Sequence, residues 1–189
     1  MPLAQRYKRK FTYTDYLTWP EDERWELIDG VAYNMTPAPS SIHQRIAGNF
    51  FYILKNRLSG KTCIPFFAPT DVVLSEYNVV QPDVFVVCDE KKITEANIQG
   101  APDLIVEMLS QATAVKDRRE KKSLYEKYGV NEYIIVDPTE QYIERFRLKE
   151  DSIYDKGDVL GSKETLSLRS LEGIEIPLRE VFEVDAPHL

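Results

Sequence analysis

Two carboxylates stand beside apolar runs of this sequence, where an acidic side chain is costly. Asp83 closes the segment Gln81-Pro82-Asp83 directly before the apolar run 84–88, and Glu107 lies inside the apolar run 104–109. Acids in such runs are expensive unless they are paired or bind a metal ion. Two of them can hold Mg²⁺ or Mn²⁺, which polarises a phosphodiester and lowers the pKa of the attacking water. The pair therefore predicts a metal site at Asp83 and Glu107.

A lysine on the next expected helix faces the same place. The helical repeat over residues 113–128 puts Lys121 on the stripe that should face the sheet. Lys122 is turned about 100° away, toward solvent. A lysine beside two acids can orient water or stabilise the negative charge that develops on a phosphate. The other members of the stripe are Asp117, Leu124, Tyr125 and Tyr128.

Each of these residues also has a purely structural interpretation. Asp83 can cap a backbone amide after the turn proline, and Glu107 can lie on a solvated edge. Lys121 can pair with Glu107 or Asp117. Taken singly, neither kind of interpretation prevails, but the combination of two acids with an adjacent lysine favours a functional site.

The elements that must position these residues form a mixed α+β pattern. The strand–helix–strand unit over residues 103–136 predicts a right-handed parallel crossover, and hairpin signals lie on both sides of it. A mixed sheet flanked by helices fits this order best. Strands are expected at 24–28, 31–35, 63–67, 71–74, 84–88, 103–109, 132–136 and 142–148, with weaker ones near 166 and 174; helices are expected from Ser40 or Ser41 to Gly60 and over 113–128, with a last turn at 179–182.

Composition points to a soluble protein with one domain over residues 1–189. Hydrophobic residues make up 43% and charged residues 29% of the chain, as in ordinary globular proteins. The apolar runs are far shorter than the ~18 residues that a membrane span needs, and no apolar segment follows the basic start of the chain. Cys63 and Cys88 lie in apolar stretches and are expected to be buried thiols, with one disulfide as the alternative. The expected location is the cytoplasm, without a membrane partner.

Charge is distributed unevenly along the chain. The net charge of −7 argues against a general nucleic-acid coat protein. Residues 1–10 and 116–127 nevertheless hold ten of the 24 basic residues and three of the 31 acidic ones. Such an uneven charge distribution can present a basic face to phosphate, although charge alone favours a solvated helix face with internal ion pairs.

Several familiar chemistries lack their usual residues. The chain contains no GxxxxGK[ST], GxGxxG or GxSxG motif, and its two histidines, His43 and His188, form no HExxH motif. A structural zinc site would need Cys and His ligands that the chain does not supply. A hard cation held by oxygen atoms is the metal that this sequence favours.

An ordered set of short segments runs through the chain and supports a family resemblance. They are Trp25-Glu26-Leu27-Ile28-Asp29-Gly30, Ser41-Ile42-His43-Gln44, Val80-Gln81-Pro82-Asp83, Ala101-Pro102-Asp103-Leu104-Ile105-Val106-Glu107-Met108-Leu109-Ser110, Asp117-Arg118-Arg119-Glu120-Lys121, Leu124-Tyr125, Gly129-Val130-Asn131-Glu132-Tyr133 and Val136-Asp137-Pro138. This set, over residues from about 12 to 183, resembles the Uma2 family of restriction-endonuclease-like proteins in the PD-(D/E)xK nuclease superfamily.

The resemblance implies a restriction-endonuclease-like fold, a mixed sheet with helices on both sides. It carries the superfamily's acids onto Asp83 and Glu107. The superfamily's lysine would fall at Leu109, and in the Uma2-like pattern it has moved to Lys121. The resemblance also brings Glu26 to the metal site, with exposure on a short hairpin strand as the alternative.

Further residues are candidates for holding the substrate. The resemblance suggests Gln81 as a residue that positions substrate or water. His43 lies on the apolar stripe of its helix, where a packed or hydrogen-bonded role is more common than that of a base. The basic helix supplies Lys122 and Arg118 for contact with DNA.

Three functions are compatible with these residues. The first is a Mg²⁺-dependent or Mn²⁺-dependent endonuclease that hydrolyses DNA phosphodiester bonds. The second is a catalytically inactive nuclease-fold protein that binds nucleic acid or a protein partner, which the acidic charge and Leu109 favour. The third is a metal-dependent hydrolase of a smaller phosphate ester. A homodimer is expected, because aromatic residues fall in edge elements and nucleases often pair two sites. These aromatic residues are Trp19, Trp25, Tyr142 and Phe146.

Overall fold

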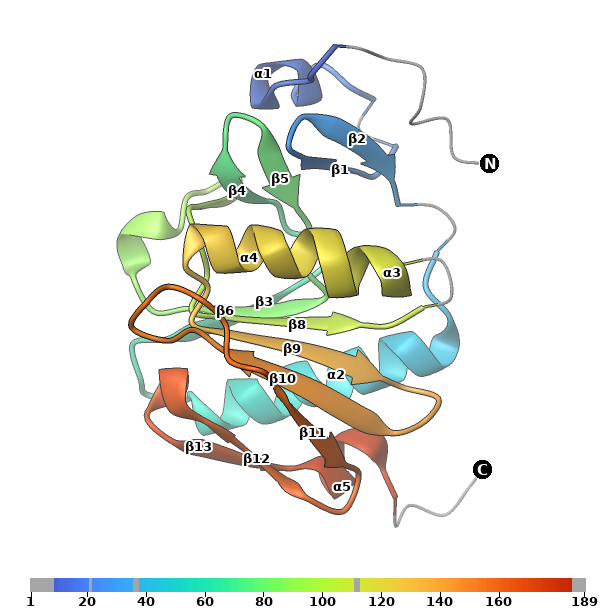
Figure 1. The fold of residues 1–189 in the computed structure, drawn as a ribbon, viewed down its shortest axis with the longest axis vertical. Helices are drawn as coiled ribbons and strands as arrows, with labels where there is room; N and C mark the ends of the chain where they lie inside the picture. Colours follow the sequence, from blue (N-terminus) through green and yellow to red (C-terminus); the bar gives the residue numbers. More distant parts are fainter. Residues whose placement is uncertain (1–8, 21, 36–37, 111–112, 185–189) are drawn as a thin grey trace.

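The computed structural model describes residues 9–20, 22–35, 38–110 and 113–184. Its strands form three sheets (Figure 1), a five-stranded sheet in the order β2-β1-β5-β4-β7, a six-stranded sheet in the order β11-β10-β9-β8-β6-β3, and the pair β12-β13. Of the basic segment 1–10, residues 1–8 lie outside the described residues, as does His188. The mixed α+β class is confirmed, but more than one sheet forms.

The helices and strands have the following bounds. The strands are β1 (Trp25–Ile28), β2 (Val31–Asn34), β3 (Ile64–Phe67), β4 (Val72–Ser75), β5 (Asn78–Val80), β6 (Val84–Val87), β7 (Ile98–Gln99), β8 (Leu104–Met108), β9 (Glu132–Asp137), β10 (Tyr142–Arg147), β11 (Asp158–Gly161), β12 (Thr165–Leu168) and β13 (Ile174–Pro177). The helices are α1 (Tyr13–Tyr16), α2 (Ser41–Arg57), α3 (Ala114–Lys116), α4 (Lys122–Tyr128) and α5 (Leu178–Phe182), with a π-helical turn (Asp117–Lys121) joining α3 to α4 and 3-10 turns η2 (Glu90–Lys92) and η4 (Arg169–Leu171). Among the described residues, no helix has the length and apolar character to cross a membrane.

The hairpin β1–β2 places Glu26 in the five-stranded sheet. Its turn is the expected pair Asp29-Gly30, whose φ angles of 49° and 77° suit a tight hairpin. A Cβ atom on Gly30 would lie 2.8 Å from the Cβ of Lys10, so a larger residue does not fit there. β1 also pairs with β5, where Leu27 faces Val79. This second pairing places the hairpin in the five-stranded sheet and not in the six-stranded one.

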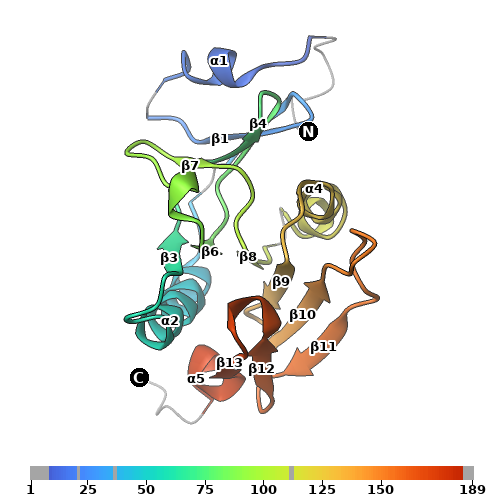
Figure 2. The same ribbon diagram turned by 90° about the vertical axis from the view of Figure 1, so that its left-hand side faces the viewer.

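Helices cover both faces of the six-stranded sheet. Side chains alternate along β8, so that Val106 joins the core cluster that contains α2, and Ile105 joins the cluster that contains α4. Figure 2 shows α2 and α4 on opposite sides of the strands. β8 and β9 are parallel neighbours, which confirms the predicted crossover through α3 and α4.

A partly buried ionic group connects the pair β12–β13 to the six-stranded sheet. Glu132 of β9 accepts hydrogen bonds from the Arg147 Nε at 3.1 Å and from the Ser170 hydroxyl at 2.6 Å. Arg145 binds the Asp158 carboxylate and donates to a carbonyl of β12. We call Glu132, Arg145, Arg147 and Asp158 the C-terminal staple.

The two cysteines form a disulfide, so the prediction of free thiols was wrong and its alternative holds. The antiparallel pairing of β3 with β6 puts Ile64 opposite Val87. The flanking residues Cys63 and Cys88 therefore face one another across the strands. This proximity comes from a pairing between segments that are 25 residues apart, which the sequence does not reveal.

Candidate active site

Asp83 and Glu107 meet at the end of two paired strands. Val84 of β6 lies opposite Val106 of β8 in an antiparallel register. Asp83 precedes one member of this pair and Glu107 follows the other, so the two acids occupy the next opposed position. The Asp83 Oδ2 atom accepts a hydrogen bond of 2.8 Å from the backbone N–H of Met108. The two acids predicted from separate sequence segments therefore lie together.

His43 holds the other oxygen of Asp83. Its Nε2 atom lies 3.0 Å from the Asp83 Oδ1 atom. Ser40 caps α2 by accepting from the His43 backbone N–H at 3.3 Å, which fixes the start of the helix beside β6. His43 is 8% exposed. The structure thus gives His43 the hydrogen-bonded role that its position on the apolar stripe favoured.

Glu107 is buried and hydrogen-bonded through one oxygen to two side chains. Its Oε1 atom lies 2.8 Å from the Lys121 Nζ and 2.7 Å from the Tyr125 hydroxyl, which donates to it. Burial raises the pKa of the Glu107 carboxyl to about 8, against the lowering effect of Lys121. The negative charges of Asp83, Asp117 and Glu26 act in the same direction as burial. Glu107 is therefore the acid of this site that most readily holds a proton.

Glu26 joins the site from the other sheet. The Glu26 side chain is fully buried, and its two carboxylate oxygens lie 2.8 Å from the Nζ atoms of Lys121 and Lys116. Burial alone would raise the pKa of Glu26, but the two ammonium groups outweigh it and hold the pKa at about 2. Of the two alternatives for Glu26, the structure supports a place in the site and not exposure.

A π-helical turn brings both lysines to Glu26. Residues five apart in an α-helix point about 140° away from one another. Here the Asp117 carbonyl accepts from the N–H of Lys122, five residues on, and the chain forms a wider turn. The Tyr133 hydroxyl of β9 donates to the same carbonyl at 3.1 Å. Lys116 and Lys121, also five residues apart, can therefore reach the same carboxylate.

Lys121 lies where the helical stripe predicted. Its side chain is 3% exposed, and it contacts Glu107, Glu26 and, at 3.9 Å, Asp117. Burial by itself lowers the pKa of Lys121, but these three carboxylates raise it well above its usual value. The lysine is therefore a fixed positive charge at the centre of the site.

Three predicted substrate-binding residues lie outside this cluster. The Gln81 side chain accepts from Arg24 at 2.9 Å and donates to Asp71 at 2.8 Å, and only its backbone N–H reaches Glu26. Arg118 binds Glu144 at 2.6 Å. Lys122, expected to point into solvent, is half-buried with its Nζ 3.8 Å from the centre of the Phe146 ring.

Four residues of the site were not among the predicted site residues. They are Lys116, Asp117, Tyr125 and Tyr133. Tyr125 was on the predicted stripe, and its position one α-helical turn after Lys121 was the available signal. Lys116 carried no signal, because the α-helical repeat puts it on another face from Lys121.

Carboxylates outnumber ammonium groups around Glu107. We call Glu26, Asp83, Glu107 and Asp117, with Lys116 and Lys121, the acidic cluster; fully ionised, its four carboxylates exceed its two ammonium groups. In the described ranges no group of three or more His, Cys, Asp or Glu side chains is arranged to hold a metal ion. The available donors are the opposed carboxylates of Asp83 and Glu107. Such a pair fits Mg²⁺, which keeps several of its waters in proteins.

The fold of this chain is also found in a solved structure. A crystal structure described as a putative nuclease belonging to DUF820, from Anabaena variabilis, has the same fold with a TM-score of 0.76. The two chains share 17% identity, and the similarity covers 92% of this chain and 98% of that one.

Sequence comparison identifies the family. Residues 13–179 match the Uma2 family, whose description is "Putative restriction endonuclease". The chain belongs to this family. It is also 29% identical over 146 residues to an uncharacterized protein of Synechocystis sp., which covers 75% of this chain and 76% of that protein.

Proposed function

We propose that this protein is a Mg²⁺-dependent endonuclease that hydrolyses DNA phosphodiester bonds at the acidic cluster. The observation that carries the proposal is the opposed pair of Asp83 and Glu107, with the Lys121 ammonium 2.8 Å from Glu107. Membership of the Uma2 family supports a nuclease, and the excess of carboxylates supports the metal. Mn²⁺ has the same preference for oxygen ligands and is expected to substitute.

Individual residues of the site would have different roles. Asp83 and Glu107 would hold the cation, which when bound would supply Lewis-acid polarisation of a phosphodiester. His43 and the Met108 N–H fix the orientation of the Asp83 carboxylate. Lys121 and Tyr125 do the same for Glu107. Glu26 binds both Lys116 and Lys121 and so fixes the positions of their ammonium groups relative to one another.

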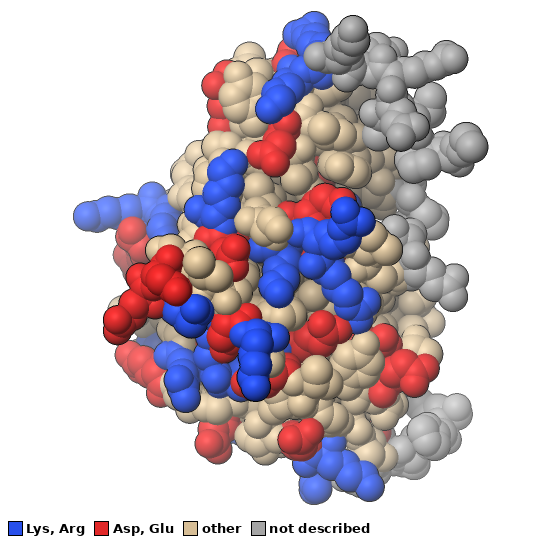
Figure 3. All heavy atoms as spheres, viewed as in Figure 1, with Lys and Arg blue, Asp and Glu red and all other residues tan. Residues whose placement is uncertain are grey.

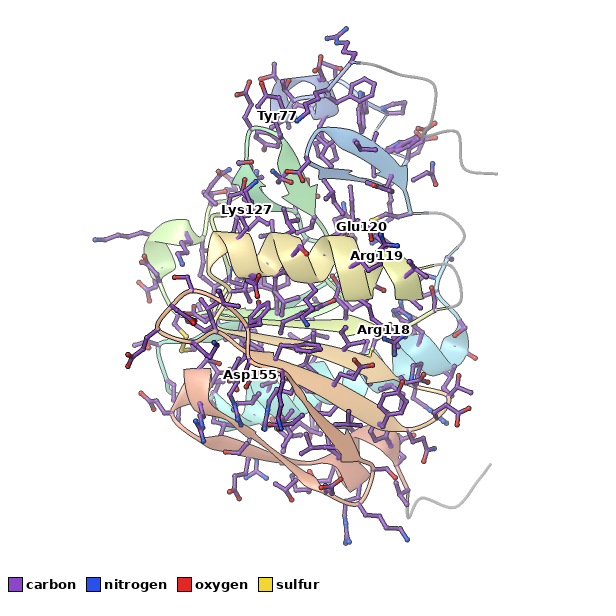
Figure 4. The ribbon with its side chains drawn as sticks, viewed as in Figure 1. Tyr77, Arg118, Arg119, Glu120, Lys127 and Asp155 are labelled. Carbon is purple, nitrogen blue, oxygen red and sulfur yellow. A yellow bond between two sulfur atoms is a disulfide. The ribbon has the colours of Figure 1, made fainter. Side chains whose placement is uncertain are left out.

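The outer side of the crossover helix is the surface proposed for the DNA backbone. Figure 3 shows basic side chains gathered across the middle of this face. Figure 4 places Arg118, Arg119 and Lys127 around the helix, and Arg119 and Lys127 are exposed. Lys122 lies between them in sequence. Phosphate contacts by such residues would give sequence-independent affinity that falls with salt.

A nuclease assay tests the proposal directly. Pure protein is incubated with Mg²⁺ or Mn²⁺ and with duplex, single-stranded and branched DNA, and the products are resolved by size. We expect metal-dependent cleavage that is lost in Asp83→Asn and retained in a variant of the C-terminal staple, Glu132→Gln. Absence of cleavage on every substrate with both metals would refute the endonuclease. Cleavage of a small phosphate ester alone would favour the smaller-substrate hydrolase.

Metal binding has a separate readout. A cation that binds only the folded state stabilises it by mass action, by about 2.7 kcal/mol at a hundred times its Kd. We expect millimolar Mg²⁺ to raise the Tm of the wild type and to leave Asp83→Ala and Glu107→Ala unchanged. A wild-type Tm that does not respond to either metal would remove the main support for the metal site.

The enclosure of Lys121 favours a second candidate, a nuclease-fold protein that binds nucleic acid without cleaving it. The lysine is 3% exposed and surrounded by carboxylates. In that case duplex DNA binds with strong salt dependence while the strand stays intact under all metal conditions. The binding and cleavage assays together separate the two functions.

A homodimer and a cytoplasmic location stay predictions. The aromatic residues that suggested a dimer surface pack within the chain; Trp19 contacts Trp25 with ring centres 5.4 Å apart, and Phe146 is buried. Sedimentation at micromolar concentration tests the dimer, which a single 21.9 kDa species would refute. Disulfides are rare in the cytosol, so labelling of Cys63 and Cys88 thiols in intact cells tests the location.

A further inference from the structure

Carboxylates surround the Lys121 ammonium group. An ammonium group has three N–H donors. Glu26 and Glu107 each lie 2.8 Å from the Lys121 Nζ, and Asp117 lies at 3.9 Å. With 3% of its side chain exposed, Lys121 could bind a phosphate only by giving up one of these carboxylates. Its position suits a residue that holds acids in place.

Lys116 is more exposed than Lys121 and lies within hydrogen-bond distance of fewer carboxylates. Its side chain is 16% exposed, close to the 17% of Asp83 at the same site. Its Nζ is 2.8 Å from one Glu26 oxygen and 5.2 Å from the centre of the Tyr33 ring, and its charge also acts on Asp117. With one hydrogen-bonded carboxylate, Glu26, the ammonium group keeps N–H donors for a second anion.

The wide turn of the helix fixes Lys116 relative to the metal-site acids. Glu26 binds Lys116 through one oxygen and Lys121 through the other, and Lys121 in turn binds Glu107. The accessible ammonium is therefore linked to the buried one through a single carboxylate, and to Glu107 through two ion pairs. Of the two lysines, Lys116 is the more exposed, with 16% of its side chain accessible against 3% for Lys121.

We propose that Lys116 is the lysine that contacts the substrate phosphate and that Lys121 is a positioning residue for Glu107 and Glu26. The inference rests on the proposed function and specifies its substrate contact. The positive charge of Lys116 faces an oxygen of the phosphodiester, while Glu26 restricts where the ammonium group can lie. This assignment replaces the expectation that Lys121 itself stabilises the charge on the phosphate.

The number of phosphate contacts can be measured from the salt dependence of binding. Each contact contributes about 0.9 to the slope of log affinity against log salt on duplex DNA. We compare wild type, Lys116→Met and Lys121→Met on one labelled duplex by fluorescence anisotropy in EDTA. We expect Lys116→Met to lose about one unit of slope and Lys121→Met to keep the wild-type slope. Lys116→Arg retains the charge and should restore the slope.

A double variant controls for loss of the folded structure. Lys116→Met leaves Glu26 with one ammonium partner, so Glu26→Gln/Lys116→Met, which also removes the carboxylate charge, is measured against Glu26→Gln. The same loss of about one unit is expected. An unchanged slope on removal of Lys116 in both backgrounds, or a loss of slope in Lys121→Met instead, overturns the assignment.

Cleavage of the same duplex with Mg²⁺ separates this inference from the proposed function. If the wild type cleaves and removal of Lys116 leaves the slope unchanged, the endonuclease stands and the assignment of Lys116 fails. If the wild type neither binds nor cleaves the duplex, both fail. If it cleaves and the slope falls by about one only without Lys116, both are supported.

Discussion

Two ionic groups among the described residues are built on different principles. The C-terminal staple balances the two acids Glu132 and Asp158 with the two arginines Arg145 and Arg147. The acidic cluster has four acids for two lysines, and it raises the pKa of Glu107 to about 8 through burial and neighbouring acids. The first group pairs its acids and cations one to one, whereas the second brings together more carboxylates than ammonium groups and raises the pKa of Glu107.

The choice of cation follows the same division. Arginine offers a planar set of donors that can bind carboxylates and carbonyls together. Arg147 uses it on Glu132 and on the Ser167 carbonyl, which joins the large sheet to β12. Lysine concentrates its charge on one atom, and Lys121 uses it to hold carboxylates from both larger sheets. The group that joins strands through carbonyls thus uses arginine, and the group that gathers carboxylates uses lysine.

The largest expected difference between the two groups is in cleavage rate. Glu107→Gln keeps the shape of the side chain but removes a ligand of the proposed metal, and it should lower the rate by about 10³-fold. Glu132→Gln should leave the rate within twofold, as measured by single-turnover cleavage of a labelled duplex. Equal losses in the two variants would mean that the acidic cluster is only another structural group.

The pH dependence of stability is the next largest effect. The folded-state pKa of Glu107, about 8, is above its ordinary value of 4.5. Its contribution to stability is therefore fully present below pH 4.5 and is lost as the pH rises through about 8. In EDTA, the free energy of unfolding of the wild type relative to Glu107→Gln should fall across this window, as measured with urea at several pH values. A constant difference would contradict the raised pKa.

Loss of the C-terminal staple should reduce stability and leave the response to Mg²⁺ unchanged. In Glu132→Gln an amide replaces a carboxylate that accepts from Arg147 and from the Ser170 hydroxyl. Hydrogen bonds to charged groups contribute about 2 kcal/mol, so urea unfolding should show a loss of that order. Mg²⁺ should stabilise this variant as much as the wild type. A lost response to Mg²⁺ would show that the two groups are coupled.

The smallest effect is expected at the π-helical turn. Tyr133→Phe removes the hydroxyl that donates to the Asp117 carbonyl, which keeps its bond from the Lys122 N–H. Because one hydrogen bond is lost, stability should fall by about 1 kcal/mol. The cleavage rate should fall less than tenfold, since Lys121 keeps its carboxylates. A loss of rate of tenfold or more would contradict this prediction.

The sequence predicted those parts of the site that depend on the regular repeat of a single helix or strand. The helical repeat placed Lys121 toward the sheet, and the two acids in apolar surroundings were correctly brought together. Lys116 was missed because a π-helical turn changes that period and has no mark of its own in the sequence. Gln81 was expected at the substrate, but its partners Arg24 and Asp71 come from other segments.

The prediction of the fold was also limited to features that are local in the sequence. Long apolar runs gave β6, β8 and β9, and Asp29-Gly30 gave the first hairpin. The short strands β5, β7 and β11 were missed, because they lack a run long enough to show alternation. The disulfide and the division into separate sheets both depend on which strands pair, and pairing is decided by packing between distant segments.

The wide turn before α4 also constrains how the chain can change in length. Removal of one residue from a helix rotates its two ends by about 100° against each other. Here Lys116 precedes the turn and binds Glu26, while Leu124 and Tyr125 follow it and pack in the core. A single-residue deletion within 117–121 that restores a regular α-helix can preserve one of these contacts but not both. Insertions and deletions should therefore be tolerated in the surface loops and selected against in this one turn.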